Sequence, residues 1–386
     1  MDYEQSKYHI VKQANLYIAN HSHYTWFQHP GSVYELATLK LLDIKGITTF
    51  APLQEFPHLK SLEFGTTDST LTIPDLVGLD QASHLERLAF VSKTKIKHNI
   101  EVIARLSNLQ SLGLYNVQQA LPEDLLSALT ALQSVSLCKH NYNSSASLPA
   151  TLEEISITVD GLATLPSIPP AIGVKKVSLH GNRCQMDTLH SFAIFPNAEE
   201  IKINAPKILT DLSYVSKLQR LKVLDINFAP VSDLTALDQH PAIEELRLRG
   251  SLVEQLDSIK SCPALKILYL EKSKLQSIAN IRTQFPQLQQ LWIWGTKVKD
   301  LTPLTDMSTL QNLDVTMLKP KSWDFLATLT GLEVLDVYKT SFADLQLLLE
   351  LPNLKKVRLA HSNVDVESDE YHALEHVILA RGGVLK

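Results

Sequence analysis

The residues whose types and spacing are suited to catalysis lie near the end of the sequence, in His372-Ala-Leu-Glu375-His376. This spacing matches the H-x-x-E-H pattern of one class of zinc peptidases, in which two histidines on one helix face bind the metal beside a catalytic glutamate. Such a site needs a further ligand and a surrounding domain, and only ten residues follow His376. We therefore favour a terminal helix here and keep a metal-dependent hydrolase as the enzymatic alternative.

Two further clusters contain residue types that bind metals. His21, His23 and His29 lie close together near the start of the chain, and we interpret them as ordinary cap or loop histidines. The alternating acids Asp365, Glu367 and Asp369 lack the glycine of a calcium-binding loop, so we expect a solvated turn.

Cysteine chemistry is equally poorly supported. Cys138, Cys184 and Cys262 are few, odd in number and scattered, as is typical of reduced thiols in the cytoplasm rather than of a disulfide framework. All three lie within repeats, and no catalytic domain accompanies them. We therefore predict no catalytic residue, no metal site and no cofactor.

The elements that position all these residues come from a repeat. An apolar-x-x-apolar-x-apolar pattern returns about every 22 residues, and a period of this size indicates a solenoid. Each of the three apolar positions holds Leu, Ile, Val or Phe in every repeat, except at Ala198. The fifteen repeats open at Leu39, Leu59, Leu85, Leu109, Leu132, Leu152, Val174, Ala198, Leu221, Ile243, Leu265, Leu288, Leu310, Leu332 and Leu354.

One repeat predicts one coil. Leu291 and Ile293, two residues apart, fit a short strand whose alternate side chains enter a core. Val298, Leu301 and Leu304 follow at spacings of three, which suits a tight helical or extended return path on the other wall of that core. A single coil cannot bury its own apolar face, so stacking must stabilise it.

This repeating pattern of apolar residues resembles that of leucine-rich repeat proteins. Ser or Thr takes the place of the usual Asn after the strand, as in the internalin-like class, at Ser251, Ser273, Thr296, Thr340 and Ser362. The stretch 148–182 resembles the shorter repeat of bacterial effector proteins, which favours a bacterial origin. The resemblance implies an α/β solenoid: a curved, right-handed coil with a parallel β-sheet on the concave face and short helical or extended segments on the convex face.

The ends of a solenoid must cover its last apolar faces. We assign residues 1–38 to an N-terminal helical cap, with an amphipathic helix over 2–20 that includes Tyr8, Val11 and Ile18. Residues 39–362 form the solenoid, with no internal domain boundary. Residues 363–386 form a C-terminal cap whose helix begins at Ser368, runs through Ala380 and closes at Gly382.

Composition narrows the classes of partner. The formal net charge is −5 and the pI about 6.3, so no basic surplus favours nucleic acid or an anionic membrane. The first residues lack a charged leader with an apolar stretch, and no apolar run approaches the roughly 20 residues that span a bilayer. We expect a cytoplasmic protein, with leaderless secretion as an effector left open.

The predicted concave wall carries the strongest binding signal. Strand residues that flank the core positions point outward onto this wall, and later repeats place aromatic and charged residues there. Aromatic residues and arginine are enriched at protein interfaces. The predicted partner-binding residues are Trp292, Trp294, Tyr269, Tyr338, Arg247, Arg249, Asp225, Asp314, Asp336 and Arg358. Two interpretations compete with partner binding. Trp292 and Trp294 are folded against neighbouring strands or covered by a terminal segment, or the interleaved Arg and Asp residues only pair across strands. Trp323 occupies an inward position and is predicted to lie in the core.

The resulting hypothesis is a non-enzymatic scaffold that binds a folded protein on its concave face. An inhibitor or immunity protein and an effector-like adaptor remain as roles within this class. The alternatives outside it are the hydrolase at His372, Glu375 and His376 and a carbohydrate ligand stacked on the tryptophans. We expect a monomer, with a homodimer through the aromatic stripe as the alternative.

Overall fold

The chain forms two compact units. The computed structural model describes residues 8–11, 15–19, 37–42, 49–66, 70–115, 117, 120–138, 147–165, 167–181 and 184–386. The first unit spans Met1–Gly181 together with Ser191–Pro196, and the second spans Asn182–His190 together with Asn197–Lys386. Both are built from the same kind of coil.

The first unit is a parallel sheet with short helical returns. In order across the sheet, its parallel strands are β2 (Asn15–Ala19), β3 (Thr38–Leu42), β4 (Ser61–Gly65), β6 (Arg87–Phe90), β8 (Ser111–Gly113), β9 (Ser134–Cys138), β10 (Glu154–Thr158) and β11 (Lys176–His180). β1 (Tyr8–Val11) joins β2 antiparallel, and β5 (Leu71–Asp75) and β7 (Thr94–His98) form a second, two-stranded sheet. The returns contain η2 (Ala51–Glu55), η3 (Leu79–Gln81), η4 (Ile100–Arg105) and α1 (Leu125–Ala128), while η5 (His190–Ile194) has residues in both units.

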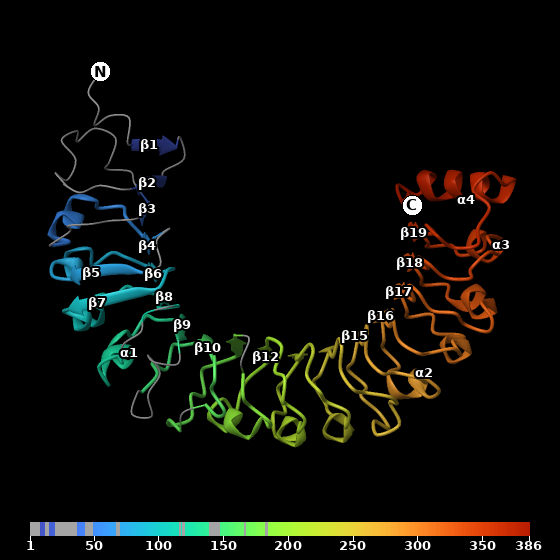
Figure 1. Cartoon of the computed structure of the whole chain (residues 1–386), viewed down its shortest axis with the longest axis horizontal. Helices are drawn as coiled ribbons and strands as arrows, with labels where there is room; N and C mark the ends of the chain where they lie inside the picture. Colours follow the sequence, from blue (N-terminus) through green and yellow to red (C-terminus); the bar gives the residue numbers. More distant parts are fainter. Residues whose placement is uncertain are drawn as a thin grey trace. The chain divides into compact units, whose positions relative to one another are not determined.

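The second unit has the same plan with shorter strands. In order along the chain these are β12 (Glu200–Ile203), β13 (Val223–Asp225), β14 (Glu245–Arg247), β15 (Ile267–Tyr269), β16 (Gln290–Trp292), β17 (Asn312–Asp314), β18 (Val334–Asp336), β19 (Lys356–Arg358) and β20 (Val384–Leu385). Each pairs in parallel with the next. The returns contain η6 (Ser213–Lys217), η7 (Thr235–Leu237), α2 (Ile281–Gln284), η8 (Thr302–Leu304), η9 (Asp324–Thr328) and α3 (Gln346–Leu349). In Figure 1 the strands of this unit lie along its concave side and the helical returns along its convex side.

The core of each coil lies between strand and return, as the repeat predicts. Leu291 and Ile293 of the strand side and Val298, Leu301 and Leu304 of the return are all buried. Equivalent residues of neighbouring coils stack on them, as in the register of Leu268 with Leu291. Burial of each such aliphatic side chain contributes about 1.5–3 kcal/mol relative to exposure, so stability grows with the number of stacked coils.

Several turns after the strands of the second unit use the predicted hydroxyls, whereas the Ser251 hydroxyl is buried without a hydrogen-bond partner. Thr340 donates from its Oγ1 to the carbonyl of Val337 at 2.7 Å and accepts from the amide of Phe342 at 3.2 Å. Thr296 donates in the same way to Ile293 at 2.7 Å. A side-chain hydroxyl thus satisfies turn backbone that would otherwise be buried without partners.

The predicted N-terminal helix is wrong where the structure describes this part of the chain. Tyr8–Val11 and Asn15–Ala19 are strands, and β2 pairs with β3 so that Leu16 aligns with Leu39. Leu39 in turn aligns with Leu62, the fourth position of its repeat, so the first predicted repeat was placed three residues too late. Two apolar residues separated by one form the strand signal of this repeat, and residues 15–19 contain it.

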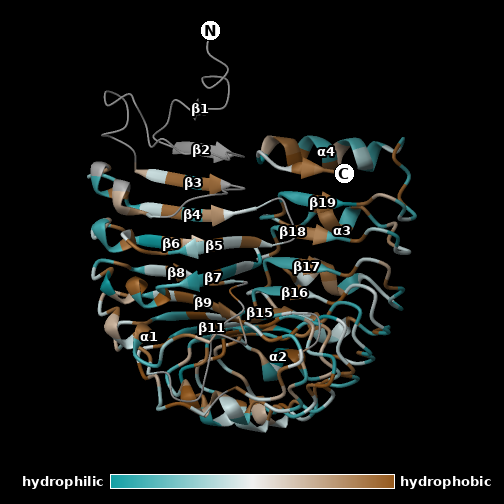
Figure 2. Ribbon diagram, turned by 60° about the vertical axis from the view of Figure 1, so that its left-hand side comes forward, coloured by the Kyte–Doolittle hydropathy of each residue, from teal (hydrophilic) through white to brown (hydrophobic). Residues whose placement is uncertain are grey.

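The predicted C-terminal helix is confirmed. The helix α4 (Asp369–Ala380) has Ser368 as its N-cap, whose hydroxyl accepts from the Tyr371 amide at 3.2 Å, and Gly382 adopts φ 69° beyond its end. Figure 2 shows hydrophobic and hydrophilic residues side by side along α4. Leu374 and Ile378 supply its buried face. The chain then adds β20 to the edge of β19, which was not predicted. No helix within the described residues is both long and apolar enough to span a bilayer.

Candidate functional site

One row of outward residues crosses the sheet of the second unit in register. The parallel pairing aligns the middle outward position of each coil directly with that of the next. We call this the central row, and it consists of Asp225, Arg247, Tyr269, Trp292, Asp314, Asp336 and Arg358. All seven were predicted from the sequence as outward wall residues. Trp294, Tyr338 and Arg249 lie two positions further along their coils.

The middle of the central row is a stack of flat groups. The rings of Tyr269 and Trp292 lie 4.1 Å apart and are tilted by 9°. The guanidinium carbon of Arg247 lies 4.6 Å from the centre of the Tyr269 ring, and Arg247 also donates to Glu245. Stacking and cation–π contacts each contribute about 0.5–1.5 kcal/mol, so these side chains hold one another in place.

Trp294 is covered by cations of its own chain. The guanidinium carbon of Arg249 lies 5.4 Å from its ring centre and the ammonium nitrogen of Lys272 lies 4.7 Å from it. Arg249 also lies 5.5 Å from the ring of Phe228, a residue that is 51% exposed. A half-buried tryptophan with two cations over it forms a polar and aromatic surface at the strand exit.

A third contact joins cation, ring and carboxylate. The guanidinium carbon of Arg358 lies 4.1 Å from the ring centre of Tyr338, and Arg358 pairs with Asp336 at 3.2 Å. Asp336 also accepts from the Tyr338 amide at 3.0 Å and from the Thr316 hydroxyl at 2.8 Å. Arg358 and Asp336 thus pair across strands, as the competing interpretation expects, whereas Arg247 pairs with Glu245 on its own strand.

Burial raises the pKa of three acidic side chains on this wall. Burial raises the pKa of Asp314, which accepts from the Thr316 amide at 2.9 Å but also has the like charge of Asp336 nearby. Burial likewise raises the pKa of Asp225, against the opposing effect of Arg247. Glu271 is only 7% exposed, and burial raises its pKa as well. Its Oε2 is buried without a hydrogen-bond partner, which is unusual for a carboxylate.

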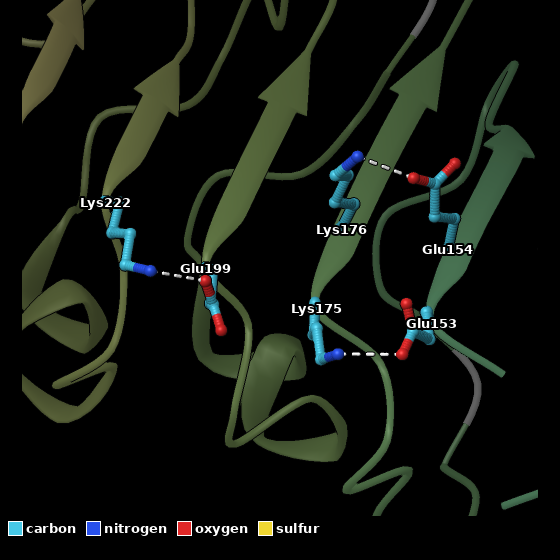
Figure 3. Close-up of polar contacts among 6 residues, drawn as sticks. All are labelled: Glu153, Glu154, Lys175, Lys176, Glu199 and Lys222. Atoms are coloured by element: carbon cyan, nitrogen blue, oxygen red, sulfur yellow. Dashed lines mark hydrogen bonds and ion pairs between the residues drawn. The ribbon is translucent and has the colours of Figure 1, made fainter. Parts of the chain in front are cut away.

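Another charged row lies at the start of the strands and consists of ion pairs between neighbouring coils. In the second unit Glu199 pairs with Lys222 at 2.7 Å, and in the first unit Glu153 pairs with Lys175 at 2.7 Å (Figure 3). Glu244 pairs with Lys266 at 2.8 Å in the same position. Exposed pairs of this kind contribute little to the free energy of unfolding, because solvent screens them.

Three solved structures share the fold of the chain. A leucine-rich repeat protein of Leptospira interrogans matches with a TM-score of 0.61 and 16% identity, over 91% of this chain and 90% of that one. An internalin of Listeria monocytogenes matches with a TM-score of 0.55 and 18% identity, over 89% of this chain and 86% of the internalin chain. The mouse RP105/MD-1 complex contains a chain that matches with a TM-score of 0.59 and 20% identity, over 89% of this chain and 70% of that one. The fold is that of a leucine-rich repeat protein.

Curated sequences add only partial matches to this leucine-rich repeat chain. Acidic leucine-rich nuclear phosphoprotein 32 family member A of Drosophila melanogaster is 30% identical over 100 residues, which are 26% of this chain and 38% of the fly protein. The 187-kDa microtubule-associated protein AIR9 of Arabidopsis thaliana is 28% identical over 133 residues, which are 34% of this chain and 8% of the plant protein. The chain therefore matches well under two thirds of either relative, and no family model matches it. Because bacterial and animal proteins share the fold, bacterial origin stays a prediction.

The enzymatic alternative gains no support from the leucine-rich repeat structure. His372 and His376 lie exposed on α4 beside the half-buried Glu375. Among the described residues no group of three or more His, Cys, Asp or Glu side chains is arranged to hold a metal ion. The cluster of His21, His23 and His29 lies outside the described residues.

The remaining sequence candidates have structural explanations. Asp365 accepts from the Glu367 amide at 3.0 Å in the exposed turn before α4. All three cysteines are free and buried, and burial raises the pKa of Cys262 to about 11, which disfavours a nucleophilic thiolate. Trp323, predicted in the core, is half-buried instead; its ring meets that of Phe342 edge-on at 5.2 Å.

Sequence reasoning missed residues of the leucine-rich repeat wall at the turn after each strand. Phe228, Lys272 and Met317 occupy the same turn position, with φ of 64°, 55° and 65°, and Phe228 and Met317 are about half exposed. The equivalent position is Gly250 or Gly295 in other coils, with φ of 70° and 67°. A glycine recurring at one position indicates a left-handed conformation, which disfavours large side chains. A Phe or Met at such a position was therefore the available signal for an additional exposed apolar group.

Proposed function

We propose that this leucine-rich repeat protein is a non-enzymatic scaffold that binds a folded protein through the central row of its second unit. The observation that supports this most strongly is the stack of Arg247, Tyr269 and Trp292, which lies on three neighbouring strands in register. Rigid aromatic and arginine side chains contribute most of the binding energy at protein interfaces. Because they are already stacked, little side-chain entropy is lost when a partner binds.

The charge of the wall favours protein over nucleic acid as the partner. The central row contains three aspartates and two arginines, which gives it a formal charge of −1. A surface that binds phosphates through electrostatics needs a positive surplus instead. The fold itself does not decide the question, because related structures include both the TLR13–ssRNA13 complex and the RP105/MD-1 complex.

Within this proposal the chain acts as a cytoplasmic monomer, either as an inhibitor or immunity protein or as an effector-like adaptor. A solenoid wall suits both roles because it offers a large preformed contact surface. Three free and buried cysteines are in keeping with a reducing compartment. No described feature favours a catalytic role, so we place the enzyme hypothesis behind the scaffold.

The test is affinity capture from lysate of the native cells. Wild-type protein and a Trp292→Ala/Trp294→Ala variant serve as baits, and mass spectrometry identifies the retained proteins. The matched control is Ser136→Ala/Ser156→Ala, which changes the corresponding row of the first unit. We expect a protein that the wild type and the serine variant retain and the tryptophan variant loses. Circular dichroism checks that all baits are folded, and equal retention by all three would refute the proposal.

A further inference from the structure

Trp292 has one ring face covered by Tyr269, and its register neighbour on the other side is an aspartate. Its ring stacks on Tyr269 of β15 on one side, while its partner in register on the other side is Asp314 of β17. Among the described residues no aromatic ring or cation lies against this second face. A tryptophan face with no ring or cation against it, next to an aspartate on the neighbouring strand, is a suitable site for a cation, because the ring and the carboxylate both attract it.

Two carboxylates beside the tryptophans lack the ion pair that their neighbours have. Asp314 accepts from the Thr316 amide but forms no ion pair within the described part of the chain, whereas Asp336 pairs with Arg358 at 3.2 Å. Glu271, on the strand before the tryptophans, is buried with an unpartnered Oε2. Burial raises the pKa of Glu271, against the opposing charges of Arg249 and Arg247. The charge of Asp314, across the coil that carries Trp292, also raises it. The Nε of Arg249, whose charge acts on Glu271, is also buried without a hydrogen-bond partner, so Trp292 and Asp314, rather than Glu271, define the candidate cation site.

The same wall already contains a complete version of this arrangement. Arg358 stacks on Tyr338 at 4.1 Å while it pairs with Asp336 at 3.2 Å. Arg247 stacks on Tyr269 in a similar way at 4.6 Å. In both cases the cation is a flat guanidinium, which packs face to face on a ring and donates to oxygen at its edge. At Trp292 and Asp314 a ring and a carboxylate lie on adjacent strands in register. No guanidinium of the described residues forms an ion pair with Asp314, although the charge of Arg358 acts on it at longer range.

We propose that an arginine side chain of the partner protein inserts between Trp292 and Asp314 and completes this arrangement. The proposal rests on the proposed function and specifies the chemistry of the partner, a surface arginine rather than an acidic or apolar group. An acidic group would be repelled by Asp314 and Glu271, whose negative charges flank the tryptophan coil. Arginine is favoured over lysine because its planar group matches the stacked geometry of the wall.

The direct test uses a small probe. The blocked peptide acetyl-Gly-Gly-Arg-Gly-Gly-amide is titrated into protein labelled with ¹⁵N-tryptophan, and the indole N–H resonances are followed by NMR. The chain has four tryptophans, so the Trp292 resonance can be assigned from a Trp292→Phe variant. A single side chain binds weakly, with a Kd of about 1 mM, which this method measures. We expect a saturable shift of the Trp292 resonance.

Two controls separate arginine recognition from nonspecific binding. The citrulline peptide keeps the shape of arginine without its charge, and we expect it to bind at least about fivefold more weakly. Asp314→Asn should weaken the arginine peptide by about tenfold, because the carboxylate that pairs with it is neutralised. Glu333→Gln, whose carboxylate pairs with Lys355 at 3.2 Å at the start of the next strand pair, should leave binding unchanged.

The outcomes distinguish this inference from the proposed function. No shift at Trp292, equal binding of the citrulline peptide, or stronger binding of a glutamate peptide would each overturn the arginine site. If a captured partner is lost with Trp292→Ala/Trp294→Ala but binds Asp314→Asn as tightly as wild type, the scaffold stands and the arginine site fails. If instead every captured protein binds the wild type and all these variants equally, the proposed function itself fails.

Discussion

The two units share the same repeating backbone, but the outward side chains of their strands differ in kind. In the first unit the residues in register at the middle outward position are small across most of the sheet: Ala89, Gly113, Ser136, Ser156 and Ser178. In the second unit the same position holds the central row of charged and aromatic residues. The repeat therefore determines where side chains lie, while the outward residues determine what a wall can bind.

The largest expected effect is on the free energy of unfolding, and it tests whether the two units have the same kind of buried core. Leu112→Ala in the first unit and Leu291→Ala in the second remove fully buried side chains at the same repeat position. We expect each to lower the free energy of unfolding by about 2–5 kcal/mol, because a cavity remains in a stacked core. Urea unfolding followed by circular dichroism measures this, and a large effect in one unit only would show that the buried cores differ.

The next effect is on the affinity for the partner, and it shows which unit carries the binding surface. Trp292→Ala/Trp294→Ala should weaken the captured partner by about 100-fold or more, since central aromatic residues each contribute about 2 kcal/mol or more at interfaces. Ser136→Ala/Ser156→Ala should leave the affinity within about twofold, since neutral contacts contribute little. Calorimetry with the purified partner provides both values. A loss caused by the serine variant would place binding on the first unit.

A smaller effect distinguishes acids in the two units by the sign of a pH dependence. Burial raises the pKa of Asp314, so ionisation of this carboxyl destabilises the folded state at neutral pH. Asp314→Asn should therefore be more stable than wild type at pH 7, and the difference should shrink as the pH falls through the raised pKa. A neutral variant less stable than wild type would contradict this account of Asp314.

Asp75 in the first unit should behave in the opposite way. The side chain of Asn99 donates to Asp75 at 2.6 Å and lowers its pKa, so the ionised form stabilises the folded state at neutral pH. Asp75→Asn should be less stable than wild type at pH 7, and the difference should disappear as the pH falls through the lowered pKa. Thermal unfolding of both pairs of proteins across the acid range measures the two signs.

The smallest effect is expected where the units are alike. Lys175→Met and Lys222→Met each remove one exposed ion pair at the start of the strands (Figure 3). Such pairs are screened by solvent, so each Tm should change by no more than about 2 °C. A larger change in the second unit alone would mean that this row also supports the wall.

Most of the fold could be predicted because the apolar residues that form the core follow a spacing within each coil. The spacing of Leu291, Ile293 and Val298 specifies a strand and its return without knowledge of distant contacts. The first strands were missed because Tyr8, Val11 and Ile18 also fit a helical spacing, and a short amphipathic pattern does not decide between the two. The strand β20 was missed because two residues carry almost no periodic signal.

The sequence predicted which residues of the candidate site point outward from the sheet, but it did not predict which side chains contact one another. Alternation along each strand identified Tyr269 and Trp292 as outward residues, and the sheet register then aligned them. That Trp294 is covered by Arg249 and Lys272, or that Glu271 is buried, depends on side-chain conformations on neighbouring coils. Sequence spacing within one coil contains no information about these choices.

The most direct test of the account is hydrogen–deuterium exchange on the complex with the captured partner. If the central row is the binding surface, added protection should centre on peptides that cover 267–273, 290–296 and 312–318, with little change over the strands of the first unit. Protection confined to β8, β9 and β10, or to the convex returns, would contradict a binding site built on Tyr269 and Trp292.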